Sequence, residues 1–175
     1  TLDIAKRVAL RLQNSGLAVR LTRKRDSTLT LQDRTSRAGS RKGDLFVSIH
    51  LNSADNSAAA GLETYVLPAA GYLSTAGGAP GTNSCPGNIF DGSSILLAYN
   101  IHAQILSCAT NMADRGIKRA RFDVLSSAPC PAVLIECGFI SNSGDAGKLR
   151  RETFLDSVAD GIARGILAYI KAAKA

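Results

Sequence analysis

The sequence has 175 residues, of which 45% are hydrophobic and 20% charged, a composition typical of one globular domain. Lys and Arg number 21 against 14 Asp and Glu, and the net charge of +7 favours an anionic partner, either nucleic acid or an acidic cell-wall polymer. Aromatic residues make up only 5% and Trp is absent, which argues against base stacking on nucleic acid. No apolar run approaches the ~20 residues that cross a bilayer, so we expect no transmembrane segment.

Helical and strand-like patterns alternate along the chain. The predicted elements are, in chain order, a helix over 2–13, a strand over 17–22, a helix from 31 to about 39 or 43, strands over 44–52 and 61–67, a long helix over 94–114, a short strand over 122–125, a strand over 131–138 and a closing helix over 154–171. Thr30 is placed to cap the second helix, with Asp33 at the capping-box position. The alternation indicates an α/β fold, a single domain over residues 1–175 with a mostly parallel sheet flanked by helices.

Residues 68–93 interrupt this alternation. They contain six Gly and three Pro with little periodicity, and both residue types disfavour a helix. We therefore expect an irregular inserted loop. Loops of this length within compact domains are usually either functional or disordered.

Four cysteines stand at positions 85, 108, 130 and 137, without any CxxC pair, so the spacing of a zinc ribbon is absent. Cys108 and Cys137 fall within predicted apolar elements and are interpreted as small core residues. Cys85 and Cys130 fall in predicted loops, and whether they pair is a question that the sequence leaves open.

Two predicted strands each carry one reactive side chain near the carboxyl end. His50 follows an apolar run and suits a metal-ligand or general-base role, with a structural, hydrogen-bonded histidine as the alternative. Glu136 lies in a second apolar run, where burial would raise its pKa towards that of a general base; a strand-end carboxylate that reaches solvent is the alternative. Ligand crevices of open α/β sheets lie at the carboxyl ends of strands, so we expect the two side chains to meet there.

The other candidates carry weaker signals. His102 falls off the apolar face of a predicted helix and is interpreted as a surface or boundary residue. Glu63 lies on an alternating strand that could equally turn it to solvent, and Glu152 is interpreted as ordinary helix surface. A serine nucleophile is disfavoured because no G-x-S-x-G is present. Cys137 is disfavoured because the adjacent Glu136 would raise the pKa of its thiol.

Two blocks of sequence are diagnostic when taken together. Ser48–Ser53 (S-I-H-L-N-S) resembles the S-I-H-x-N segment of the zinc-dependent N-acetylmuramoyl-L-alanine amidases of bacterial cell walls. Pro131–Asn142 (P-A-V-L-I-E-C-G-F-I-S-N) is similar to that family's P-A-V-L-I-E-x-G-F-x-S-N block. Shorter matching segments follow the family order at Leu21–Arg23, Leu31–Arg34, Gly61–Tyr65 and Arg115–Lys118. The resemblance covers nearly the whole chain apart from residues 68–93.

The resemblance implies one zinc ion held by two histidines and one glutamate, with water in the open position. It implies hydrolysis of the amide that joins N-acetylmuramic acid to the L-alanine of the stem peptide. His50 matches a zinc-ligand position and Glu136 the catalytic glutamate, which would handle protons while zinc lowers the pKa of the water. The family's other two ligands precede the position matched by Leu2, so one of three ligands is visible and we expect a first strand to be missing.

Peptidoglycan is therefore the expected partner, and nucleic acid is not, since that reading rests on net charge alone. The location implied by the function is periplasmic or extracellular, because such an enzyme must reach the wall. A need for an activator protein stays open. The alternative function is a catalytically inactive wall-binding or regulatory domain on the same scaffold, which the two unseen ligands permit.

Overall fold

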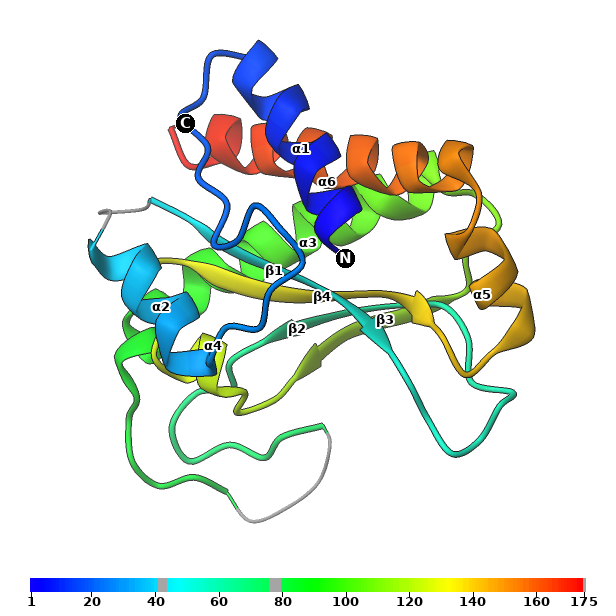
Figure 1. Ribbon diagram of the computed structural model, residues 1–175. Helices are drawn as coiled ribbons and strands as arrows, with labels where there is room; N and C mark the ends of the chain where they lie inside the picture. The colour runs from blue at the N-terminus through cyan, green and yellow to red at the C-terminus, as the bar shows by residue number, and fades with distance from the viewer. Residues whose placement is uncertain (41–43, 76–79, 175) are drawn as a thin grey trace.

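One mixed sheet organises the described part of the chain, which in this computed structural model comprises residues 1–40, 44–75 and 80–174 (Figure 1). Its strands are β1 (Phe46–Asn52), β2 (Leu62–Val66), β3 (Asp114–Arg119) and β4 (Ala132–Phe139), in the order β1-β4-β2-β3. β1 runs parallel to β4, and β2 runs parallel to β3, whereas β2 and β4 are antiparallel. The predicted α/β class with a mostly parallel sheet is confirmed.

Three long helices cover one face of the sheet (Figure 1): α1 (Leu2–Asn14), α3 (Asp91–Cys108) and α6 (Glu152–Ala172). Each buries the apolar positions that helical spacing predicts. The larger core cluster joins them to the strands through residues such as Ile4, Val8, Leu12, Leu62, Leu97, Ile101, Val133, Ile135, Val158 and Ile162. Because β4 is buried along seven of its eight residues, it reads in the sequence as an apolar run that only Glu136 interrupts.

Two glycines set the distance between α3 and α6. A Cβ atom added at Gly161 would meet the backbone of Ile105, and one at Gly165 would meet the backbone of Ile101. Close backbone approach therefore requires glycine at both positions, four residues apart on one face of α6.

A smaller apolar cluster covers only one end of the opposite face. It contains Phe46, Leu67, Val124, Leu125, Ala128, Cys130, Ala132 and Leu134. The short elements near this end are α2 (Leu31–Ser40), η1 (Pro86–Phe90) and α4 (Asp123–Ser126), while α5 (Ser143–Leu149) follows β4. The rest of this face carries polar side chains, and these form the candidate site.

The predicted capping box of α2 is confirmed. The Thr30 hydroxyl accepts a hydrogen bond from the Asp33 N–H at 3.1 Å, and the Asp33 carboxylate accepts one from the Thr30 N–H at 3.3 Å. α2 ends at Ser40, close to the predicted stop at Gly39, while the alternative stop at Gly43 lies outside the described residues.

The predicted strand at Leu17–Thr22 is wrong. The alternating residues Leu17 and Val19 instead pack against the larger core from a segment without regular secondary structure. The segment forms no ladder with any strand that the structure describes. A strand needs a partner for its backbone groups, which alternation by itself does not provide.

The region between α3 and β4 was also misread. Phe122–Leu125 is not a strand, because residues from Asp123 to Ser126 form the single-turn helix α4. The strand of this region is β3, which carries mostly charged residues and so shows no apolar pattern. Short apolar runs do not distinguish a strand from one helical turn.

Helix boundaries differ as well. α3 begins at Asp91 rather than Ser94 and ends at Cys108, well before the predicted Asp114. The irregular segment consequently ends earlier than residue 93, since η1 occupies Pro86–Phe90. α5 was not predicted, and its seven residues are too few to show a helical period.

Candidate functional site

The register of the sheet brings three ionisable side chains into one row. β4 lies between β1 and β2, and Glu136 pairs with His50 on one side and with Glu63 on the other. Residues directly opposite each other in a ladder share a face of the sheet. The flanking Ile135 and Cys137 belong to the core under the helices, so the row faces away from α1, α3 and α6. His50 and Glu136 therefore lie at paired positions on neighbouring strands and on one face of the sheet.

Glu136 has an unsatisfied, buried carboxylate oxygen. Its Oε2 is shielded from solvent and has no hydrogen-bond partner among the described residues. Burial, and then the negative charge of Glu63, raise the pKa of Glu136 from 4.5 to about 7. A buried carboxyl without a partner is costly in its charged form, so this position holds a proton far more readily than a surface glutamate.

Glu63 occupies the opposite electrostatic situation, although its side chain is only 3% exposed. Burial alone would raise its pKa, but hydrogen bonds from Lys118, Arg115 and Tyr65 outweigh burial and lower it. Asn52 adds a fourth donor at 3.0 Å. Glu63 therefore remains an anion beside Glu136.

His50 is half-buried at the end of β1. Its Nε2 lies 3.0 Å from the hydroxyl of the buried Ser48, which can donate to or accept from this nitrogen. Burial, followed by the positive charge of Arg34, lowers the pKa of His50. The imidazole is therefore neutral at physiological pH, the form that binds a metal or accepts a proton.

A buried aspartate fixes the strand ends on which these groups lie. The Oδ2 of Asp145 accepts the Gly61 N–H at 2.7 Å and the Phe139 N–H at 3.1 Å, and Lys148 pairs with its other oxygen at 3.2 Å. Gly61 precedes β2 and Phe139 ends β4. Asp145 thus joins the start of one strand to the end of the other and holds the register that sets Glu63 beside Glu136.

The remaining candidates lie elsewhere. His102 is not a surface residue as predicted: it is 6% exposed, with Nδ1 2.9 Å from the Thr64 hydroxyl and Nε2 2.9 Å from Asp114. Thr64 belongs to the face under the helices, so His102 does not join the row. Glu152 lies on the exposed surface and pairs with Arg7.

The cysteines take no part in the site. Cys137 is fully buried, as predicted, and burial raises the pKa of its thiol. Cys108 is partly exposed rather than core. Cys85 and Cys130 both contact the smaller apolar cluster and are free thiols in the described structure.

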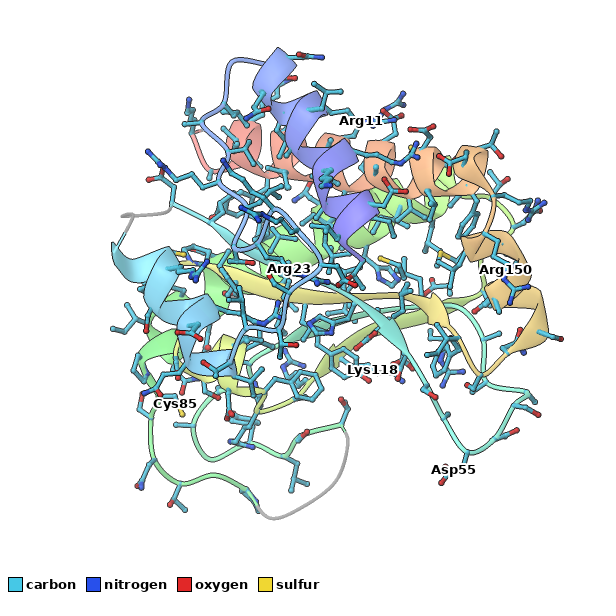
Figure 2. All side chains as sticks on the ribbon, in the orientation of Figure 1. Arg11, Arg23, Asp55, Cys85, Lys118 and Arg150 are labelled. Atoms are coloured by element: carbon cyan, nitrogen blue, oxygen red, sulfur yellow. The ribbon has the colours of Figure 1, made fainter. Side chains whose placement is uncertain are left out.

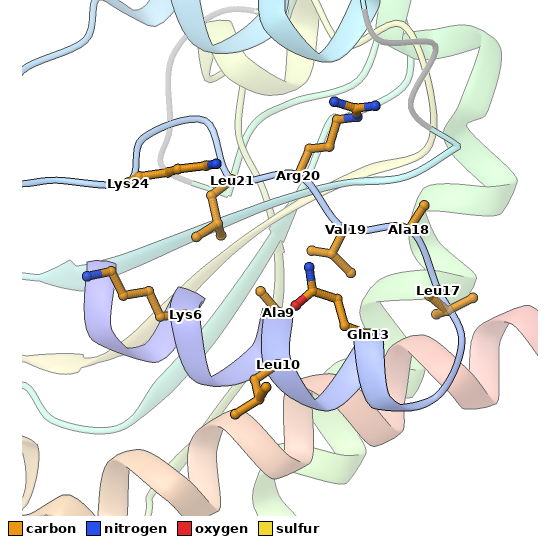
Figure 3. A pocket seen from close by; sticks show the side chains of 10 residues that line it. All are labelled: Lys6, Ala9, Leu10, Gln13, Leu17, Ala18, Val19, Arg20, Leu21 and Lys24. Carbon is orange, nitrogen blue, oxygen red and sulfur yellow. The ribbon is translucent and has the colours of Figure 1, made fainter.

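A groove lies apart from the row, between α1 and residues 17–24 (Figure 3). It measures about 600 Å³ and is lined by apolar side chains such as Leu10, Leu17 and Val19 with lysine and arginine at its rim. None of its lining residues is a carboxylate or a histidine. The groove therefore lacks the carboxylate and imidazole groups that the row provides.

The described residues do not make a zinc site by themselves. Across residues 1–40, 44–75 and 80–174, no group of three or more His, Cys, Asp or Glu side chains is placed to hold a metal ion. Glu63 already accepts four hydrogen bonds, so within the row His50 and Glu136 are the side chains left to bind a metal ion. A catalytic zinc takes three protein ligands, which this set does not supply.

Sequence reasoning missed the partners of Glu63. Asn52, Tyr65, Arg115 and Lys118 come from three strands and converge on one carboxylate (Figure 2 labels Lys118). One signal was present: alternation in β2 puts Glu63 and Tyr65 on the same face. The sequence contained no comparable signal for Arg115 and Lys118, because β3 has no apolar pattern.

Comparisons with known proteins agree with this geometry. The family described as N-acetylmuramoyl-L-alanine amidase matches residues 1–168. N-acetylmuramoyl-L-alanine amidase LytC of Bacillus subtilis is 36% identical over 97% of this chain, and AmiA of Escherichia coli is 31% identical over 96%. The chain spans 30% of the length of LytC and 66% of that of AmiA.

Solved structures show the same fold. The amidase from Clostridium difficile 630 superposes with a TM-score of 0.82 at 33% identity, covering 97% of this chain and 81% of that one. AmiC2 of Nostoc punctiforme gives 0.81 at 32% identity, with 97% and 82% covered. Sequence and fold together show that the chain belongs to the N-acetylmuramoyl-L-alanine amidase family.

Proposed function

We propose that this chain hydrolyses the amide bond between N-acetylmuramic acid and L-alanine in peptidoglycan. The observation that supports this proposal is the state of Glu136, whose Oε2 is buried without a partner and whose pKa is raised to about 7. A carboxyl of this kind suits proton transfer near neutral pH. Family membership supplies the substrate, because relatives that match most of this chain are named N-acetylmuramoyl-L-alanine amidases.

Glu136 would serve twice in this reaction. Its carboxylate would accept a proton from the attacking water, and the resulting carboxylic acid would return the proton to the leaving nitrogen as the amide C–N bond breaks. The products are a glycan with a free lactyl carboxyl and a peptide with a free amino group. Glu63, held as an anion on the neighbouring strand, keeps the affinity of Glu136 for that proton high.

The family implies a zinc ion, and we propose one of its three protein ligands. We propose His50 as one ligand, since its neutral imidazole ends β1 beside Glu136. Three protein ligands are needed, and the described residues supply His50 alone in that role. A complete site at this position therefore requires ligands beyond those that the structure describes.

Substrate and location follow from the same assignment. We propose peptidoglycan as the partner and a periplasmic or extracellular site of action, since that polymer lies outside the cytoplasm. Among the described helices, none is both long and apolar enough to pass through a membrane.

The described part of residues 68–93 is proposed to contact substrate at the rim of the site. Thr75 exchanges backbone and hydroxyl hydrogen bonds with Arg119 at 2.8 Å, which ties this segment to the free edge of β3. Arg121 donates to the carbonyl of Tyr72 at 2.7 Å. Tyr72 and Leu73 are left exposed beside this tether, where a glycan or peptide can reach them.

A second function has one observation in its favour. The absence of a three-residue metal group among the described residues fits a wall-binding or regulatory domain that does not hydrolyse its ligand. Such a domain would bind peptidoglycan and leave its amide bonds intact. Product analysis separates the two proposals directly.

The test uses a form of the protein with the two remaining zinc ligands in place, incubates it with Zn²⁺ and purified peptidoglycan, and identifies released stem peptides by mass spectrometry. We expect peptides with a free L-alanine amino group, and a loss of rate of ~10²–10⁴-fold for Glu136→Ala. Glu152→Ala, on the exposed surface of α6, is the matched control and should retain the rate. Binding of peptidoglycan without release of peptide would replace hydrolysis by the wall-binding function.

A further inference from the structure

Five side chains form what we term the Glu63 cluster: Glu63, Asn52, Tyr65, Arg115 and Lys118. Oε1 of Glu63 accepts from Arg115 Nε at 2.7 Å and from Lys118 Nζ at 2.5 Å. Oε2 accepts from the Tyr65 hydroxyl at 2.7 Å and from Asn52 Nδ2 at 3.0 Å. A carboxylate has about four acceptor sites, so Glu63 is saturated by these four donors.

The two cations of the cluster keep most of their donors unused. Arg115 carries five N–H groups and Lys118 three, and each spends one on Glu63. Within the described residues, neither side chain has another hydrogen bond or ion pair. Both reach solvent, with 36% of the Arg115 side chain and 27% of the Lys118 side chain exposed.

The orientation of these donors is fixed in advance. Arg115 lies with its guanidinium carbon 5.1 Å from the centre of the Phe139 ring, so the ring and Glu63 hold it from two sides. Lys118 donates to a carboxylate that is buried and accepts three further hydrogen bonds. Donors held in place before binding lose little freedom when a ligand arrives.

The charges of the cluster do not balance. One cation is sufficient to neutralise Glu63, and the cluster contains two, which leaves an excess positive charge beside Glu136. An unused, partly exposed, charged fork beside a fixed ammonium is suited to a carboxylate. We propose that Arg115 and Lys118 bind a carboxylate of the stem peptide. This inference rests on the proposed function, because it presumes that a muramoyl peptide occupies the site.

The position of the cations selects which carboxylate. Glu63 lies one strand from Glu136 and β3 lies two strands away, so the donors lie ~5–10 Å from the reacting amide. An extended peptide covers ~3.4 Å per residue, which places the carboxylate on the second or third residue of the stem. The lactyl carboxyl of the sugar is consumed in the amide bond, so the glycan side offers no such group.

The test compares two soluble ligands that differ at one group. N-acetylmuramoyl-L-alanyl-D-isoglutamate carries a free carboxylate on its second residue, and the isoglutamine analogue carries an amide there. Calorimetry on the full chain, with mass spectrometry to verify that each ligand stays intact, gives both affinities. We expect the free acid to bind about 10-fold more tightly than the amide. This comparison needs no protein variant, so a folding defect cannot obscure it.

Variants of the two cations then show whether their side chains cause the preference for the free acid. Lys118→Gln and Arg115→Gln should each reduce the preference for the free acid to less than about 3-fold, since a neutral amide replaces a charged donor. Arg119→Gln removes one charge from the same strand without touching the cluster and should keep the 10-fold preference. Circular dichroism verifies the fold of each variant.

Three results would overturn the inference: equal affinity for both ligands, a preference that survives in Lys118→Gln and Arg115→Gln alike, or no binding of either ligand at millimolar concentration. Release of stem peptides from peptidoglycan by the same preparation would show that the proposed function stands even then. Failure of that release with the ligand preference intact would instead leave the carboxylate subsite in a wall-binding domain.

Discussion

Glu136 and Glu63 are chemically identical residues, paired across neighbouring strands, that hold their protons very differently. Burial raises the pKa of Glu136 to about 7, because no donor compensates its charge, whereas four donors lower that of Glu63. The anion at Glu63 then adds to the rise at Glu136. Two carboxyl groups in contrasting surroundings are the usual way in which a site divides acid–base roles from electrostatic ones.

The raised pKa of Glu136 predicts a stability cost at high pH. The folded chain holds this proton more tightly than the unfolded chain between pH 4.5 and about 7, so its contribution to stability is full below pH 4.5 and is lost as the pH rises through 7. The pKa difference sets an upper bound of about 3 kcal/mol, which solvent screening reduces because Glu136 is only partly buried. Glu136→Gln cannot ionise, so we expect it to be more stable than the wild type at pH 8 by up to this amount and equal at pH 4.

Urea unfolding at pH 4, 6 and 8 measures this difference. Glu152→Gln, whose carboxylate is 74% exposed, is the control and should follow the wild type at every pH. A stability difference between Glu136→Gln and the wild type that does not change with pH would contradict the assignment.

The two residues at strand ends could be predicted from sequence, and their surroundings could not. His50 and Glu136 each interrupt or close an apolar run, so a polar group at that place is conspicuous. Glu63 was left undecided, because its burial depends on Arg115 and Lys118 from a strand more than fifty residues away. His102 was misplaced for a similar reason, since its partners Thr64 and Asp114 belong to other elements.

At the scale of elements, α3 and α6 pack with their backbones in close approach. This approach depends on Gly161 and Gly165, which turn towards the α3 residues Ile105 and Ile101. α3 also carries His102, whose ring bridges β2 and β3. A displacement of α3 would therefore disturb the two strands that build the Glu63 cluster.

We predict that Gly165→Ala destabilises the protein. The added methyl group meets the α3 backbone rather than a flexible side chain, and forced overpacking of this kind costs about 1–3 kcal/mol or more. Gly147→Ala in α5 is the matched control: nothing lies within 4 Å of its added Cβ, so it should be neutral or stabilise by up to about 1 kcal/mol. Thermal unfolding of the two variants measures both effects, and equal Tm values would show that α3 and α6 can separate at little cost.

Elements with a clear hydrophobic period were predictable. α1, α6 and the strands β1, β2 and β4 all appear where apolar spacing placed them. The errors at Leu17–Thr22 and β3 share one cause, because a strand depends on a pairing partner that the sequence pattern does not show. The error at Phe122–Leu125 has another cause, because a short apolar run does not distinguish a strand from one helical turn. β3 is a polar strand at the edge of the sheet, and only its ladder with β2 makes it a strand.

At the scale of the molecule, the net charge of +7 is unevenly compensated. Acidic residues gather along α1 and α6, where Arg7 and Arg11 pair with a group of carboxylates: Asp3, Glu152, Asp156 and Asp160. Their charges are largely spent within this helical layer. The positive excess is therefore available to the remainder of the surface, which includes the face that carries the candidate site.

We predict that retention of the chain on purified sacculi falls as NaCl is raised from 0.05 to 0.5 M, because screening shortens the range of attraction between a cationic protein and an acidic polymer. Co-sedimentation with sacculi measures the bound fraction at each salt concentration. Sucrose at matched osmolality is the control and should leave binding unchanged. Retention that is indifferent to salt would mean that contacts other than long-range charge attraction hold the chain on the wall.

The position of β4 between β1 and β2 has a consequence for the order in which the protein matures. β1 and β2 follow each other in the chain but do not pair; the strand that joins them is made some seventy residues later. During synthesis β1 and β2 therefore cannot join one sheet until β4, which lies between them, has been made. β4 brings Glu136 with it, so the step that closes the sheet is also the step that supplies the carboxyl proposed to carry the proton. A nascent or truncated chain that ends before β4 has neither a finished sheet nor the carboxyl group on which the proposed hydrolysis depends.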